Sequence, residues 1–267
     1  MRSPLFYLVL LFMVTLFSCT KNNDDLPSGQ RIKNVISKSG LDSTWYVTFN
    51  YDANGKLFMI QDSNSQTHVH QTFIYYNSQN RLQKVFRFSY YGSPGSLLNQ
   101  FTDSFAYDNA NLISKKYSAS IQNPSYKLYH TYSYDGQKRL VADSNYSTLT
   151  NTVGSLNKFS YDANDNVVQF EQFQNSAQGF KTTNIEKASF SSNANPLQTF
   201  SDDMYFAFYY DPIELLSKNT VSQITYRDGS KKTYGYEYNS NGLPKKLIEL
   251  YQIAGWSPSN TTEFFYE

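Results

Sequence analysis

A short motif recurs along this chain at intervals of mostly about 25 to 31 residues, and it constrains the fold more than any other feature. Each copy begins with an aromatic or apolar residue, then any residue, then a tyrosine. Asp or Asn comes next, followed by a polar turn and by Leu or Val. The first copy runs from Phe49 to Leu57. Further copies centre on Tyr76, Tyr107, Tyr134, Tyr161 and Tyr238. Degraded copies lie at Phe190–Leu197 and Tyr210-Asp211, and the sequence ends with Phe264–Glu267, where another copy would begin. Repeats of this length are typical of folds in which one supersecondary unit stacks on the next.

Each copy has the pattern of a β-hairpin. Alternate residues leading into the first turn place large apolar side chains on one face of a strand, namely Trp45, Val47, Phe49 and Tyr51. Asp52 to Gly55 then supplies a turn with residues that tolerate positive φ, and Leu57 resumes the alternation. A separate two-residue hairpin signal stands at Asp228-Gly229.

These hairpins predict an all-β fold. No segment shows a sustained helical period, and Ile213 to Ser217 is the one weak helical candidate. With roughly two strands per repeat, we expect an antiparallel meander of about 14 to 17 strands. A sheet of that length must curl or close into a barrel to manage its edges and to bury its aromatic face. We therefore expect the repeat tyrosines to point into the interior.

Composition agrees with this fold and removes one class of partner. Of the 267 residues, 17% are aromatic, with 24 Tyr and 20 Phe, which are residue types that fit a pleated, half-buried surface. Lys and Arg number 23 against 22 Asp and Glu, without a strongly basic block. Nucleic acid is not an expected partner, because phosphate binding requires clustered positive charge.

The N-terminus predicts export and a lipid anchor. Leu5 to Phe17 is an apolar run too short for a comfortable membrane span. It ends in Leu16–Cys19, which resembles the lipobox of bacterial lipoproteins, and Cys19 is the sole cysteine, so no internal disulfide forms. We interpret residues 1–18 as a lipoprotein signal peptide, residues 19–31 as the lipidated Cys19 and a flexible tether, and residues 32–267 as a single β-hairpin repeat domain. The predicted location is the outer membrane, on its periplasmic face or at the cell surface.

Two resemblances follow from these motifs. Tyr51 to Leu57 resembles the YD repeat of Rhs-type and teneurin proteins, whose long hairpin arrays wind into shells, although the array here is too short to enclose a protein payload. The lipobox, the length and units such as Tyr238 to Leu243 are similar to those of Bacteroidota putative lipoproteins of unknown function with a porin-like fold. That resemblance covers essentially the whole mature chain. It implies a fold and a location, and no activity.

The sequence offers few candidates for chemistry. His68 and His70 stand two apart in an expected strand and would share a face, which suits a metal, but no third ligand is adjacent. Asp162 to Asn166 superficially resembles a calcium loop, yet the same spacing recurs elsewhere as a hairpin turn. No phosphate-binding glycine loop or nucleophile elbow is present, so we expect no cofactor and no catalytic residue. Trp45 and Trp256 are the candidate ligand-stacking residues.

Two classes of function remain. We favour a non-enzymatic cell-envelope lipoprotein that acts as a binding or structural module for a glycan, a peptide or a protein partner. The alternative is a hydrolase of polysaccharide or cell-wall material, with its acids in loops between hairpins; Asp202-Asp203 and Glu214 are mildly clustered. A lipid-embedded pore fits less well, because the non-aromatic face of the strands is rich in Asn, Ser, Thr and Glu.

Overall fold

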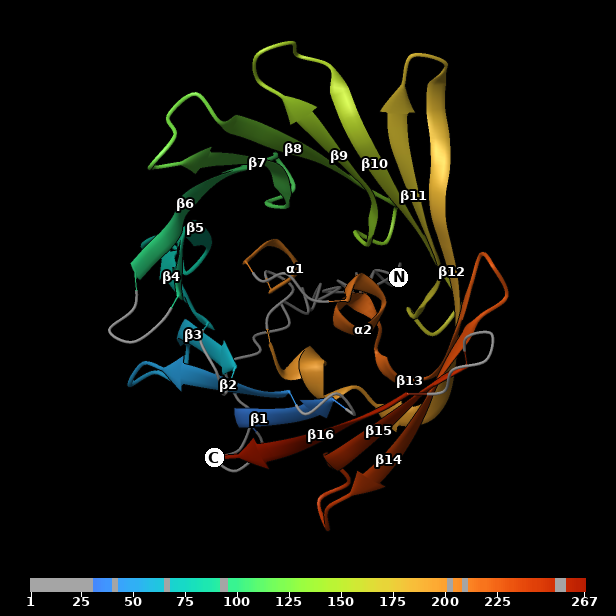
Figure 1. Ribbon diagram of the computed structural model, residues 1–267. Coiled ribbons are helices and arrows are strands. Elements are labelled where there is room, and N and C mark those ends of the chain that lie inside the picture. Colours follow the sequence, from blue (N-terminus) through green and yellow to red (C-terminus); the bar gives the residue numbers. More distant parts are fainter. Residues whose placement is uncertain are drawn as a thin grey trace, which may run out of the picture.

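The chain forms a sixteen-stranded antiparallel barrel, shown in a computed structural model (Figure 1). The structure describes residues 31–39, 43–64, 68–91, 96–200, 204–207, 211–252 and 258–267. Each strand pairs with the next along the chain, and β1 pairs with β16 to close the barrel. The predicted all-β meander and its strand number are thus confirmed, and of the two alternatives for the sheet, curling or closing, the structure shows closure.

Most strands are eight or nine residues long. The first eight are β1 (Ile32–Ser39), β2 (Thr44–Tyr51), β3 (Leu57–Asn64), β4 (His68–Tyr76), β5 (Leu82–Tyr91), β6 (Ser96–Tyr107), β7 (Ile113–Ser120) and β8 (Lys127–Tyr134). The second eight are β9 (Leu140–Ser147), β10 (Val153–Tyr161), β11 (Val167–Ser176), β12 (Gly179–Ala194), β13 (Asn219–Tyr226), β14 (Lys231–Tyr238), β15 (Pro244–Gln252) and β16 (Ser259–Tyr266).

The repeat motif builds one end of the barrel, here called the turn end. In the first copy the Asp52 carboxylate accepts hydrogen bonds from the amides of Asn54 and Lys56, both at 2.9 Å, and Gly55 takes a φ of +77°. The Asx residue of five later copies accepts the same pair of amide hydrogen bonds, at Asn77, Asp108, Asp135, Asp162 and Asn239. The motif therefore fixes a turn through its own side chain.

The repeat tyrosine locks each hairpin to the one before it. The Tyr51 hydroxyl donates to the Ile32 carbonyl at 2.7 Å, and Tyr161 donates likewise to Leu140 at 2.9 Å. The same bond, to the first residue of the preceding odd-numbered strand, is made by Tyr76, Tyr107, Tyr134 and Tyr266. A one-residue bulge in the returning strand beside each repeat tyrosine turns that tyrosine and the following apolar residue toward the same face.

The interior at this end is apolar, as the alternation predicts. Phe49, Leu57 and Ile60 are buried in the core, and Tyr51 packs against it. The inward orientation of the repeat tyrosines is confirmed for Tyr51, Tyr76, Tyr107, Tyr134, Tyr161 and Tyr266, which all pack against the core. A second set of aromatic residues lies on the outer wall, which the sequence did not predict: Phe73 packs on Phe88, and Tyr75 on Phe86.

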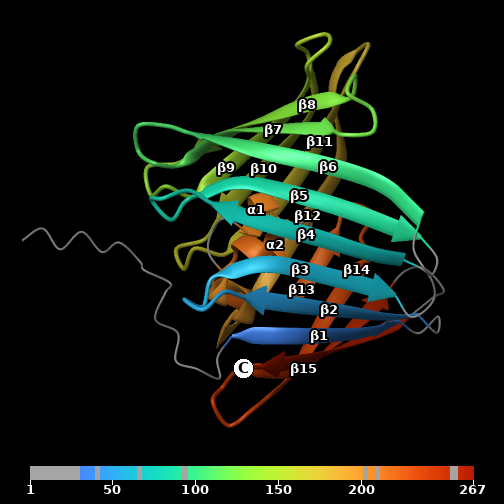
Figure 2. The ribbon, with the colours of Figure 1, turned by 90° about the vertical axis from the view of Figure 1, so that its left-hand side faces the viewer.

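The chain segment that connects β12 to β13 forms a plug inside the barrel. It consists of the 3₁₀ helix η2 (Pro196–Thr199) and the short helices α1 (Met204–Ala207) and α2 (Pro212–Leu216). Figures 1 and 2 show the two α-helices inside the ring of strands, toward the turn end. Phe200 stacks on Phe49 of the wall, with ring centroids 4.8 Å apart, so the plug is part of the core.

The plug replaces two hairpins that the degraded repeats had suggested. That expectation, for Phe190–Leu197 and Tyr210-Asp211, is wrong. Asn195 accepts from the Leu197 amide and caps η2, while Asp211 accepts from the Ile213 and Glu214 amides and caps α2. In each case a proline follows at the first helical turn, where its fixed φ favours helix over a hairpin turn. The weak helical candidate at Ile213 to Ser217 corresponds to α2.

Across the described residues, no helix is both long and apolar enough to cross a membrane.

Candidate binding site in the barrel lumen

A buried ionic cluster joins the plug to the wall on one side of the lumen. The Tyr234 hydroxyl donates to the Glu214 carboxylate at 2.9 Å, and the Lys232 ammonium lies 3.5 Å from it. Lys232 also pairs with Glu249 on β15. All four side chains are buried, and three come from the wall while Glu214 comes from α2. The cluster therefore fixes the helix in place.

The charges in this cluster depend on one another. Burial raises the pKa of Glu214 to about 7, against the opposing effect of Lys232. Burial alone would lower the pKa of Lys232, but the carboxylates of Glu214 and Glu249 outweigh it and raise that pKa. Lys232 accordingly keeps its proton at neutral pH and is the counter-ion of the cluster.

A second polar cluster holds the other side of the plug. Tyr205 of α1 donates to the Asp143 carboxylate at 2.9 Å, and that carboxylate lies 2.7 Å from His130 Nδ1. Next to it, Arg87 pairs with the fully buried Asp103 at 2.6 Å. The pKa of Lys116 is lowered, because burial outweighs the attraction of Asp103 and Asp143. Tyr205, His130 and Arg87 are each paired with a buried carboxylate, and Tyr205 thereby links α1 to the wall.

Neither cluster has the exposed paired carboxylates that a hydrolase needs. Glu214, the acid singled out in the sequence, is buried at the interface between α2 and the wall and is committed to Lys232 and Tyr234. Asp202-Asp203 lies outside the described residues. Glu214 is therefore a partner of Lys232 and Tyr234 inside the core, and its carboxylate is not exposed to a substrate.

A pocket of about 590 Å³ lies at the end of the barrel opposite the turn end. We call it the mouth pocket; its lining residues are Thr183, Asn184, Tyr226, Arg227, Asp228, Ser230 and Tyr251. They come from β12, the predicted Asp228-Gly229 hairpin between β13 and β14, and the end of β15. Its size is within the range of small-ligand sites.

The two tyrosines of the mouth pocket are half-buried, and Tyr251 is held by contacts from neighbouring strands. The Lys232 ammonium lies 5.4 Å from the centre of the Tyr251 ring, and Asn260 donates to the Tyr251 hydroxyl at 3.5 Å. Burial raises the pKa of Tyr226 to about 12, so its hydroxyl stays protonated at neutral pH. Sequence reasoning missed this site. The signal available was Lys232 itself, which shares the inward face with Tyr234 and Tyr236 and so required a buried partner.

The residues predicted from sequence lie apart from the mouth pocket or beyond the described chain. Trp45 is half-buried on β2, on the same inward face as Phe49, and its Cα pairs with Ser37 and Asn64. Trp256 and Cys19 lie outside the described residues, so ligand stacking and lipidation stay predictions.

The histidine pair lies on the inward face of β4, where Asp62 of β3 is the register partner of His70. His68 and His70 stack with ring centroids 6.5 Å apart, and His70 Nδ1 contacts the Ser89 hydroxyl at 2.8 Å. Within the described part of the chain, no three His, Cys, Asp or Glu side chains are placed to hold a metal ion.

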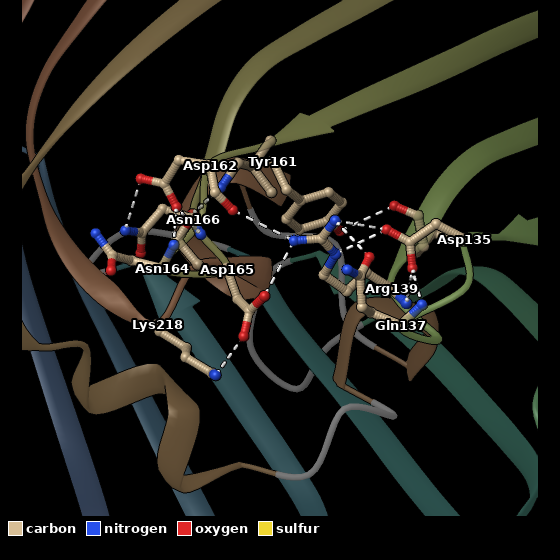
Figure 3. A network of polar contacts seen from close by, with 12 residues as sticks. Asp135, Gln137, Arg139, Tyr161, Asp162, Asn164, Asp165, Asn166 and Lys218 are labelled. Carbon is tan, nitrogen blue, oxygen red and sulfur yellow. Dashed lines mark hydrogen bonds and ion pairs between the residues drawn. The ribbon is translucent and has the colours of Figure 1, made fainter.

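The loop that resembles a calcium site is a turn of the repeat. The Asp162 carboxylate accepts from the amides of Asn164 and Asn166, as the other repeat turns do. Asp165 is paired with Arg139 at 3.0 Å and with Lys218 (Figure 3). The hydrogen bond from Lys218, assisted by Arg139, lowers the pKa of Asp165. These oxygens are occupied by the protein, and the turn interpretation is confirmed.

Comparisons with known proteins identify the fold alone. No protein-family model matches the chain, and no curated protein does. A porin-like protein from Bacteroides uniformis has a similar structure, with a TM-score of 0.59 and 12% identity, over 91% of this chain and 100% of that one. A porin-like protein from Bacteroides vulgatus matches over 89% of this chain and 98% of its own, with 10% identity and a TM-score of 0.41. The chain therefore has the predicted porin-like fold.

Proposed function

We propose that this protein is a non-enzymatic lipoprotein of the outer membrane, anchored through Cys19, whose plugged barrel binds a ligand at the mouth pocket. The observation that carries the proposal is the mouth pocket, which has the size of a small-ligand site and lies at the end of the barrel opposite the turn end. Strand β1 begins at Ile32, at the turn end, so a tether from Cys19 holds that end toward the membrane. The mouth pocket then faces away from the membrane and toward ligands.

The outer wall supports a barrel that stands clear of the lipid. Lys158 on β10 has Glu171 of β11 as its register partner, and Lys246 on β15 has Glu263 of β16. These charged residues point away from the lumen, where a lipid-facing barrel carries a continuous apolar band. The buried plug also opposes a role as a pore.

Fractionation tests the anchor and the location. The full-length Cys19→Ala variant should move from the membrane pellet to the supernatant without detergent, while wild-type protein stays in the pellet. A variant that remains in the pellet and requires detergent for extraction would contradict the proposal and favour a lipid-embedded barrel.

A binding measurement tests the site. The double variant Tyr226→Ala/Tyr251→Ala should lose binding to whichever of a panel of envelope glycans and peptides the wild type retains. Tyr75→Ala, on the outer wall, is the matched control because that residue is 49% exposed and lies on the face of β4 opposite to the buried Thr72 and Ile74. Equal binding by both variants would rule out the mouth pocket as the site.

A further inference from the structure

We infer that the ligand of the mouth pocket is an uncharged glycan, held by stacking of a sugar ring on Tyr226 or Tyr251 and by hydrogen bonds from Asn184 and Arg227. This inference rests on the proposed function and names the ligand class of the same site. It is carried by the chemistry of the pocket lining, by the closure of the barrel, and by the charge beneath the pocket.

The lining combines aromatic rings with fixed polar groups. Tyr226 and Tyr251 are half-buried, and the Tyr251 ring is held by Lys232 and Asn260. The apolar face of a sugar ring can lie on such a surface, while its hydroxyls need donors and acceptors at the edge. Thr183, Asn184, Arg227, Asp228 and Ser230 supply these around the rings.

The polar side chains are also preorganised. Asn184 donates to the Glu186 carboxylate at 2.6 Å, Arg227 donates to the Thr182 carbonyl, and Asp228 accepts from the Ser230 amide at 2.9 Å. Each side chain is held by the protein before a ligand arrives. A rigid site loses less conformational entropy on binding, which favours recognition of a ligand as polar as a sugar.

The same features disfavour a peptide. Peptides add to a sheet through a free edge, but here each strand has a hydrogen-bonded neighbour on both sides around the closed barrel, and at the mouth β13 and β14 pair through Thr225 and Lys231. A peptide helix needs an apolar groove, and among the described residues the pocket lining includes no aliphatic or phenylalanine side chain.

The charge below the pocket disfavours acidic sugars. Glu186 lies under Asn184 on the inward face of β12, and Glu249 precedes Tyr251 on the inward face of β15. The neighbouring cation, Lys232, is already paired with Glu249 and Glu214. At the rim, the positive charge of Arg227 and the negative charge of Asp228 cancel. The surplus of negative charge repels a uronic acid or another anionic sugar.

Isothermal titration calorimetry on the full-length protein tests the inference. The ligands are hexasaccharides of neutral sugars, namely cello-, xylo- and mannohexaose, beside hexagalacturonate as the acidic counterpart. At least one neutral hexasaccharide should bind, and hexagalacturonate should bind at least about tenfold more weakly. Tyr251→Ala should weaken neutral binding about tenfold or more, and Tyr75→Ala should leave it unchanged.

A second variant tests the role of charge without altering the rings. Glu186→Gln should raise the affinity for hexagalacturonate by about three- to fivefold at low salt and leave neutral binding nearly unchanged. Stronger binding of hexagalacturonate than of every neutral sugar by the wild type would overturn the inference. So would failure of all three neutral sugars.

The two proposals fail differently. If peptides bind and Tyr251→Ala abolishes that binding, the mouth pocket is the site and the glycan assignment is wrong. If neutral sugars bind but Tyr251→Ala and Tyr226→Ala have no effect, both the site and the inference fail.

Discussion

Replacing Lys232 with methionine should destabilise the barrel severely. Its ammonium is buried and is the counter-ion of Glu214 and Glu249, so its loss leaves two buried carboxylates without one. Removal of one partner from a buried ion pair typically costs about 3 to 5 kcal/mol, because the remaining charge keeps its desolvation penalty. Methionine retains most of the side-chain volume, so lost packing contributes little. We therefore expect Lys232→Met to lower the unfolding free energy by about 3 to 5 kcal/mol at neutral pH.

The pH dependence of that loss identifies its cause. The pKa of Glu214 is already raised to about 7 with Lys232 present, and removal of the cation raises it further. Some carboxyl groups have a higher pKa in the folded state than in the unfolded state. At pH values between these two pKa values, such a group binds more protons in the folded state. Stability therefore falls as pH rises through that interval. The deficit of Lys232→Met relative to wild type should shrink as the pH is lowered from about 7.5 to about 5.

Urea unfolding followed by tryptophan fluorescence measures both effects. Lys231→Met is the matched control, because Lys231 is the exposed neighbour on the same strand, and we expect it to change stability by less than about 0.5 kcal/mol. Adding Glu214→Gln to Lys232→Met should recover part of the loss. Equal losses in Lys231→Met and Lys232→Met, or a deficit that does not vary with pH, would refute the reasoning.

Three further perturbations test the turn end. Tyr161→Phe removes one hairpin-locking hydrogen bond and should cost about 1 kcal/mol in chemical unfolding, whereas Tyr75→Phe on the outer wall should cost almost nothing. Gly55→Ala should cost at least about 1 kcal/mol, because φ is +77° and a Cβ there would meet the Arg31 guanidinium; an unchanged melting temperature would contradict this. The pKa of Asp165 is lowered by its lysine and arginine partners. Its contribution to the free energy of unfolding is therefore present above the unfolded pKa of about 4 and is lost as the pH falls through the folded pKa. Asp165→Asn should therefore narrow the difference in unfolding free energy between pH 7 and pH 3. A difference equal to that of the wild type would exclude a stabilising role for the Asp165 ion pairs.

The repeat explains why so much of the fold could be predicted. Asp52 and its counterparts specify a turn through their own hydrogen bonds, and residues such as Tyr51 and Leu57 alternate at the period of a strand. These are local interactions between residues close in sequence, so a single sequence contains them. The range of about 14 to 17 strands and the inward tyrosines followed from these local patterns.

The plug and the mouth pocket could not be predicted, because they depend on long-range contacts. Asp211 has the same side-chain chemistry as the turn aspartates, but Pro212 follows it and it caps a helix. The contact of Tyr205 with Asp143 joins residues 62 positions apart. Tyr226 and Tyr251 face a common pocket only because β13, β14 and β15 are neighbours in the closed barrel.

Hydroxyl-radical footprinting of the full-length protein, with and without the tightest-binding neutral hexasaccharide, tests the central claim most directly. Ligand at the mouth pocket should protect Tyr226 and Tyr251 from oxidation and leave Tyr75 and Tyr117 of the outer wall as reactive as before. Protection of Tyr75 or Tyr117, with Tyr226 and Tyr251 unprotected, would place the ligand on the outside of the barrel and contradict the account.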